Sequence, residues 1–225
     1  MVLSDKQRLN HQKDQQKSII IFGGIFLIFC SSFLFSGYSS QKDHSSLQSG
    51  DIVFQSSQSS QSEAIRLATH SIYTHCGIVF VENNKVFIYE AVQPVKVTSI
   101  NDWIKKGKDY KYVVKRLKNA STVLTKETLT KMKACAEKFK NKDYDIYFDW
   151  SDERIYCSEL VWKVYKQGAN IEVGKLQKLK DFDLTSVPVK TKLKEKYGTR
   201  IPLDETVISP GSIFESKLLE TVEDK

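Results

Sequence analysis

The sequence has no pair of cysteines with the Cys-x-x-Cys spacing. Its four cysteines stand far apart, at positions 30, 76, 135 and 157. Structural zinc sites usually draw on closely spaced cysteine pairs, so this absence argues against such a site. His75 and Cys76 are neighbours, but adjacent side chains on a strand point to opposite faces and cannot share a metal ion. A disulfide between two of the cysteines remains open from the sequence alone.

The sequence also has neither an internal repeat nor a basic helix with interleaved aromatic residues. The second absence argues against nucleic acid as a partner. The formal net charge is +7, with lysines spread among acidic residues, and such a surface favours anionic lipid headgroups or cell-wall polymers instead. Hydrophobic residues make up 40% of the chain and aromatic residues 11%, which argues against disorder in its body.

One long apolar run lies near the N-terminus, at residues 19–35, after a polar segment at 1–18. Its length fits a short transmembrane helix or the apolar part of a signal peptide. Small residues are poorly placed for cleavage, so we favour an uncleaved membrane anchor; a cleaved segment would give a secreted protein. The positive charges before the run predict a cytoplasmic N-terminus and an exported body. The Ser- and Gln-rich residues 36–49 indicate a flexible tether, and residues 50–225 are predicted to fold as one domain.

A helix is predicted to begin at Cys157. Apolar residues follow at Leu160, Val161 and Val164, which are the spacings of one helix face. The first turn of a helix gathers free backbone N–H groups and the positive end of the helix dipole. A thiol placed there ionises more easily, and the thiolate is the nucleophilic form. A buried helix that merely contains a cysteine is the plain alternative.

A β-hairpin is predicted from Thr74 to Ala91. Two runs rich in β-forming residues flank Asn83-Asn84, which suits a two-residue turn. That turn pairs Glu82 with Lys85 and makes His75 and Glu90 diagonal neighbours on one face of the sheet. A carboxylate in this position can orient an imidazole, which is the base and orienting half of a site with a cysteine nucleophile.

Together these stretches resemble the circularly permuted branch of the NlpC/P60 papain-like hydrolases, specifically the YiiX/YebB-like cysteine hydrolases. The residues that carry the resemblance are Gly50-Asp51-Ile52-Val53, Thr74-His75-Cys76-Gly77-Ile78-Val79, Tyr89-Glu90-Ala91 and Ile155-Tyr156-Cys157-Ser158-Glu159-Leu160-Val161. The resemblance implies an α+β fold in which an antiparallel sheet packs on helices.

The expected function is that of a thiol hydrolase, an amidase, peptidase or esterase, that needs no cofactor. Cys157 attacks an amide or ester carbonyl, His75 moves the proton, and Glu90 orients the imidazole. We expect the developing oxyanion and the substrate near the N–H of Cys157, Ser158 and Tyr156. The resemblance implies a cell-wall peptide or acyl-lipid substrate. A lipid acyltransferase that uses the same acyl-enzyme and a catalytically silent, membrane-tethered binding module are the alternatives.

Some assignments stay open from the sequence. His70 is a rival base, and Asp149 and Asp152 are rivals of Glu90 as the orienting acid. The aromatic residues at 144–150 could wall a substrate pocket, although packing in the core is their more common fate. Towards the C-terminus the sequence predicts an edge strand near Pro188 and a final helix over residues 212–219.

Overall fold

The computed structural model describes residues 44–225. The predicted polar segment, the apolar run at 19–35 and most of the predicted tether therefore lie outside the described residues. Within residues 44–225, no helix is both long and apolar enough to cross a membrane. The last residues assigned to the tether pack against the domain: Leu47 is buried, and the Ser49 hydroxyl accepts a hydrogen bond from the N–H of Val81 at 2.8 Å.

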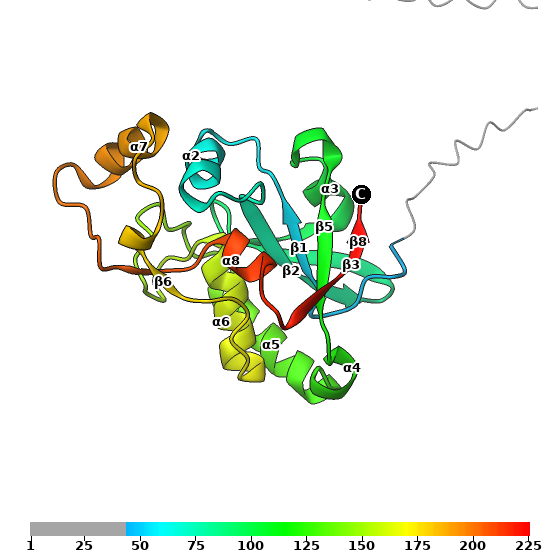
Figure 1. Ribbon diagram of the computed structural model, residues 1–225. Helices are drawn as coiled ribbons and strands as arrows, with labels where there is room; N and C mark the ends of the chain where they lie inside the picture. Colours follow the sequence, from blue (N-terminus) through cyan, green and yellow to red (C-terminus); the bar gives the residue numbers. More distant parts are fainter. Residues whose placement is uncertain (1–43) are drawn as a thin grey trace, which may run out of the picture. The chain divides into compact units, whose positions relative to one another are not determined.

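The architecture is built on a six-stranded sheet with the strand order β4-β3-β2-β1-β5-β8 (Figure 1). All five strand pairs are antiparallel, which agrees with the α+β prediction. The strands of this sheet are β1 (Ile52–Gln55), β2 (His75–Glu82), β3 (Lys85–Glu90), β4 (Lys96–Ser99), β5 (Val113–Leu117) and β8 (Leu219–Asp224). A second, two-stranded sheet pairs β6 (Gln177–Lys178) with β7 (Thr206–Val207).

The β2–β3 hairpin has the predicted register. Glu82 pairs with Lys85, and Asn83 and Asn84 both adopt positive φ angles, 49° and 59°. Asparagine tolerates this left-handed conformation better than most residues, which explains why the turn forms here. The register places the side chains of His75 and Glu90 on the same face of the sheet.

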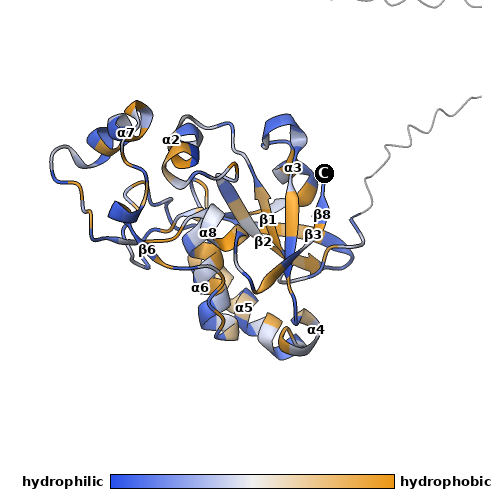
Figure 2. Cartoon of the chain, viewed as in Figure 1, coloured by the Kyte–Doolittle hydropathy of each residue, from blue (hydrophilic) through white to orange (hydrophobic). Residues whose placement is uncertain are grey.

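Helices cover both faces of the sheet. On one face α6 (Cys157–Ala169) packs against the strands, with α5 (Lys126–Phe139) beside it (Figure 1). Gly168 permits this close approach, because a Cβ at that position would lie 2.5 Å from the Cα of Met132. On the other face α3 (Ile100–Ile104) buries Trp103 against the strands. Figure 2 shows the apolar residues concentrated on the strands and on the inner side of α6.

A third apolar cluster joins α2 (Ser60–Thr69) to α7 (Val187–Tyr197). The prediction of an edge strand near Pro188 was wrong, because these residues form the first turn of α7. Proline is tolerated there, since the first N–H groups of a helix have no intrahelical partner. The prediction of a C-terminal helix over 212–219 was also wrong in extent: α8 (Pro210–Phe214) is short, and β8 follows it and pairs with β5.

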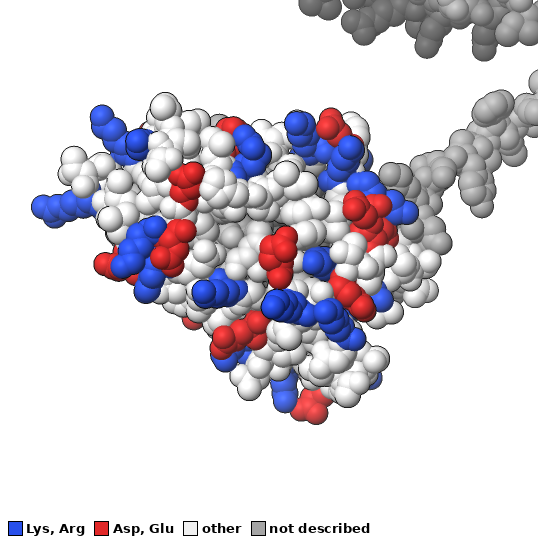
Figure 3. Space-filling model, viewed as in Figure 1, with Lys and Arg blue, Asp and Glu red and all other residues white. Residues whose placement is uncertain are grey.

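The remaining short elements are α4 (Ala120–Val123), η1 (Lys108–Tyr110) and η2 (Leu179–Asp181). On the face of the domain shown in Figure 3, lysine and arginine side chains are interspersed with aspartate and glutamate. Several charged side chains within residues 44–225 form ion pairs, such as Lys192 with Glu195 at 2.7 Å.

Candidate active site

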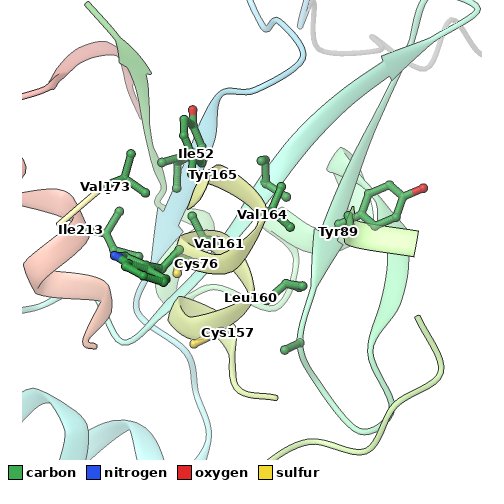
Figure 4. Packing of buried hydrophobic residues seen from close by; sticks show 14 of the residues in the cluster. Ile52, Cys76, Tyr89, Cys157, Leu160, Val161, Val164, Tyr165, Val173 and Ile213 are labelled. Atoms are coloured by element: carbon green, nitrogen blue, oxygen red, sulfur yellow. The ribbon is translucent and has the colours of Figure 1, made fainter. Parts of the chain in front are cut away.

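Cys157 is the first residue of α6, and its side chain is buried. Tyr156 is the N-cap, with an extended backbone, so the N–H of Cys157 belongs to the first turn of the helix and has no intrahelical acceptor. Figure 4 shows Cys157 at this end of α6, with Leu160, Val161 and Val164 following along the packed side of the helix. The helix start at Cys157 was therefore correctly predicted.

His75 and Glu90 are in direct contact, with 2.8 Å between His75 Nε2 and Glu90 Oε2. The other carboxylate oxygen of Glu90 accepts hydrogen bonds from Thr98 Oγ1 at 2.6 Å and from Lys106 Nζ at 2.8 Å. Burial opposes ionisation of this carboxyl group, but the bonds from His75, Lys106 and Thr98 prevail and lower the pKa of Glu90 to about 2. The carboxylate thus accepts the hydrogen bond from Nε2–H, and Nδ1 is the ring nitrogen that remains available to Cys157. The imidazole also stacks on Trp103, with 6.1 Å between ring centres.

The electrostatics favour an ionised thiol at Cys157. Its pKa lies well below the usual value of a thiol because Cys76 hydrogen-bonds to its sulfur and His75 lies beside it, and these effects outweigh burial. Burial alone would lower the pKa of His75, but its contacts with Cys157 and Glu90 raise it to about 9. Both shifts favour a thiolate beside an imidazolium, the reactive form of a cysteine nucleophile.

Cys76 lies on the opposite face of β2 from His75, in the cluster that packs against α6 (Figure 4). Burial and the neighbouring Cys157 raise the pKa of Cys76 well above its ordinary value, so it remains a protonated donor. The opposite faces were predicted from strand alternation, but no sequence signal indicated that the Cys76 thiol would reach the nucleophile. Cys76, Cys135 and Cys157 are all free thiols.

The rival residues lie elsewhere. His70 ends α2, is largely exposed and lies 3.4 Å from Asp183 Oδ2. Asp152 accepts a bond from Lys163 Nζ at 2.7 Å, and Asp149 lies 3.5 Å from the guanidinium of Arg154. Glu90 is thus the carboxylate that contacts the imidazole of His75.

Tyr156 and Ser158 both lie in the wall of the cavity next to Cys157, and both are tied to Ile208. The Ser158 hydroxyl donates to the carbonyl oxygen of Ile208 at 2.8 Å, and the Tyr156 hydroxyl accepts from the N–H of Ile208 at 3.0 Å. These bonds fix the start of α6 against the segment before α8. The hydroxyl groups of Tyr156 and Ser158 are therefore already engaged in hydrogen bonds with Ile208.

Gln61 lines the cavity but was not identified as a site residue from the sequence, whereas Tyr144 belongs to the aromatic run at 144–150 that was considered as a pocket wall. Gln61, in the first turn of α2, has a fully buried Nε2 that makes no hydrogen bond of good geometry, and its side chain lies within reach of the Tyr144 hydroxyl. Tyr144 is held beside Cys157 by a bridge between its backbone and that of Ile155. Gln61 lies in a Ser/Gln-rich stretch, where nothing in the sequence distinguishes it from its neighbours.

The cavity at Cys157 is predominantly apolar. It is formed by side chains from α2, the 144–156 segment, the 179–184 segment, α7 and the segment before α8. Its apolar walls include Ala64, Ile65, Ala68, Phe148, Leu179, Phe182, Leu184, Val189, Leu193, Val207 and Ile208. An apolar cavity that opens on a nucleophile can bury a hydrocarbon chain while the reacting bond stays at its edge.

Comparison with known proteins connects this site to a family. The chain is 50% identical over 175 residues to the uncharacterized protein YiiX of Escherichia coli strain K12, covering 78% of this chain and 85% of that protein. It also matches a crystal structure of YiiX from Escherichia coli O157:H7, with a TM-score of 0.76 and 49% identity, over 79% of this chain and 97% of the other.

The E. coli O157:H7 protein in that crystal structure is described as a metalloprotein. In residues 44–225 of the present chain, no three His, Cys, Asp or Glu side chains are grouped so as to hold a metal ion. The groups that meet at Cys157 are arranged as a nucleophile with its base. Residues 46–223 match the model of the permuted papain-like amidases of the YaeF/YiiX type, the C92 family, and the chain belongs to this family.

Proposed function

We propose that the protein is a cysteine hydrolase that cleaves the amide or ester bond of an acyl-lipid substrate through Cys157, His75 and Glu90. The observation that carries this proposal is the apolar cavity that opens on Cys157 at the start of α6, where the pKa of the thiol is lowered. Membership of a papain-like amidase family supports the reaction type. The apolar walls favour an acyl chain over a polar cell-wall peptide, because burying a hydrocarbon chain releases apolar surface from water.

The proposed reaction begins with attack of the Cys157 thiolate on the acyl carbonyl carbon. The resulting oxyanion collapses, the bond to the leaving oxygen or nitrogen breaks, and the His75 imidazolium gives its proton to that atom. An acyl thioester remains on Cys157. Water then attacks the thioester while His75 accepts one of its protons, the thiolate reforms, and the product leaves as a carboxylic acid that ionises in solution.

Glu90 would act on this sequence through the imidazole. By accepting the hydrogen bond from Nε2, the carboxylate keeps Nδ1 turned to the sulfur and stabilises the imidazolium. Lys106 and Thr98 hold the carboxylate in turn, so the orienting group is fixed on three sides. Preorganisation of this kind reduces the movement that is needed during the reaction.

The oxyanion would be stabilised by the backbone N–H of Cys157 and by the side-chain amide of Gln61. The first is a free N–H at the positive end of a helix dipole. The second is a buried donor in the wall of the same cavity, with the Tyr144 hydroxyl as a polar neighbour but no hydrogen bond of good geometry. Buried donors normally make well-formed hydrogen bonds, so a poorly bonded donor in the wall of this cavity is consistent with a role in the transition state.

The predicted anchor at residues 19–35 remains part of this proposal. An apolar segment in the membrane and an exported catalytic domain would bring the cavity close to lipid substrates. Fusion of a compartment-sensitive reporter after Lys225 tests this orientation; a reporter active only in the cytoplasm would contradict export.

The test is hydrolysis of p-nitrophenyl acetate, octanoate and palmitate, together with mass spectrometry of the intact protein. We expect kcat/KM to rise from acetate to octanoate as the chain enters the cavity. A transient acyl adduct should form on Cys157 and be absent from Cys157→Ala. The absence of an adduct with every ester would contradict the proposal and favour the binding-module alternative.

Added alcohols and amines separate hydrolysis from acyl transfer, because the same acyl-enzyme can react with either acceptor. If the ester of the added alcohol or the amide of the added amine accumulates in place of the free acid while water is in large excess, the protein is an acyltransferase.

A further inference from the structure

A lysine without an acidic partner lies in the wall of the active-site cavity. Lys196, on α7, is half-buried and lines the same cavity as Cys157. Its Nζ lies 3.9 Å from the ring centre of Phe148, another residue of the wall. Across residues 44–225, no carboxylate oxygen approaches this ammonium group within the 4.0 Å of an ion pair.

Two acidic groups act on the Lys196 ammonium through space, and neither lies within 4.0 Å of it. Asp145 accepts a hydrogen bond from the N–H of Tyr147 at 2.8 Å through Oδ1 and has a buried Oδ2 without a hydrogen-bond partner, and Glu195 pairs with Lys192 at 2.7 Å. Burial therefore has the largest effect and lowers the pKa of Lys196 to about 8.

A partly dehydrated ammonium group without a counter-ion raises the free energy of the empty site. The contact with Phe148 offsets part of this cost and holds the charge at the wall. An anion that entered the cavity would offset the rest. Charged groups whose burial is not compensated by a partner are concentrated at functional sites.

Lys192 provides the contrast within the same helix. It lies one turn before Lys196 and lines the same cavity, but its ammonium is already bound to Glu195. The ammonium of Lys196 is thus available to bind a ligand, whereas the ammonium of Lys192 is already paired.

We propose that the cavity takes an acyl substrate that carries an anionic group, a carboxylate or a phosphate, and that Lys196 binds this anion. The acyl part rests on the proposed function, because the apolar walls are assigned to the hydrocarbon chain there. The anionic part rests on the unpartnered ammonium group of Lys196.

Equilibrium binding to the full chain tests this without requiring turnover. Octanoate, octyl phosphate and octanol share one chain and differ in the headgroup. By calorimetry, the wild type should bind at least one of the two anions about tenfold more tightly than octanol, as a single charged contact can supply. Lys196→Met should lose this preference, while Lys192→Met should keep it.

The same ligands identify the source of the anion. A preference for octanoate indicates a carboxylate, and a preference for octyl phosphate indicates a phosphate headgroup. Inorganic phosphate should bind more weakly than octyl phosphate; equal binding would overturn the acyl part of the inference. Thermal unfolding of both lysine variants checks that they remain folded.

The inference is overturned if neither anion binds better than octanol, or if Lys196→Met keeps the preference. Either result would leave the proposed function intact provided that the wild type hydrolyses p-nitrophenyl octanoate. If instead Lys196-dependent anion binding is found but no acyl ester reacts at Cys157, the anion site stands and the proposed hydrolase function fails.

Discussion

At the scale of single residues, Gln61 has a role that can be separated from that of the nucleophile. If its amide stabilises the oxyanion, Gln61→Leu should lower kcat for p-nitrophenyl octanoate by about 100-fold or more, with little change in KM. The rate of Cys157 alkylation by iodoacetamide should not change, because alkylation forms no oxyanion at a carbonyl group. A parallel loss of alkylation would show that Gln61 supports the thiolate instead.

Gln58→Leu is the matched control for this prediction. Gln58 lies three residues before Gln61, but its amide donates to the carbonyl oxygen of Gly107 at 3.1 Å, outside the cavity wall. Its removal should leave kcat near the wild-type value. The pair of variants thus separates loss of a glutamine from loss of the donor in the cavity.

The ionisation of Cys157 gives the second prediction. Both Cys76 and His75 lower its pKa, so His75→Ala should raise the pKa of the thiol and move the pH profile of alkylation upward. The alkylation rate at pH 7 should fall because less thiolate is present. Peptide mapping assigns the alkyl group to Cys157. A profile in His75→Ala identical to that of the wild type would exclude the imidazole as its partner.

The residues of the site differ in how far the sequence could identify them. His75, Glu90 and Cys157 carry titratable or nucleophilic groups within strongly patterned segments, so their neighbourhood could be predicted. Gln61 lacks a hydrogen bond of good geometry, Lys196 lacks an acidic partner, and both lie in a cavity whose walls come from segments distant in the sequence. No local pattern reports an unpaired group.

At the scale of elements, the close contact between α5 and α6 positions the helix that begins at Cys157. Gly168→Ala should destabilise the domain, because the added Cβ would lie 2.5 Å from the Cα of Met132. Relief of this clash would require a shift of the helix backbone, which is energetically costly. Overpacking of this kind costs about 1–3 kcal/mol. Chemical denaturation measures the change, and an unaltered unfolding free energy would mean that the helices separate freely.

The elements that were predicted correctly contain their own signals. The hairpin has its Asn-Asn turn, and α6 has Leu160, Val161 and Val164 at the spacings of one helix face. By contrast, β8 is a strand because it pairs with the edge of β5. A local stretch of sequence carries no information about pairing with a strand so distant in the chain. The α7 segment was misassigned because Pro188 suits both an edge strand and a first helical turn.

At the scale of the whole molecule, the buried carboxyl group of Glu159 makes stability depend on pH. Burial outweighs the attraction of Lys163, 2.8 Å away, and raises the pKa of Glu159 to about 8. The unfolded chain would release this proton near the ordinary pKa of about 4.3, so the folded state holds more protons between these two values. The unfolding free energy therefore falls as the pH rises through this window.

Glu159→Gln should remove this dependence, because the amide keeps the shape of the side chain without the ionisation. The variant should gain stability relative to the wild type as the pH rises from about 5 to about 8, by roughly 3 kcal/mol at the upper end. Glu153→Gln, at an exposed position close to the same helix, is the control and should keep the wild-type slope. Urea unfolding across this range measures both slopes. If Glu159→Gln follows the wild type at every pH, the carboxyl group is already ionised in the folded protein, and Lys163 rather than burial governs its charge.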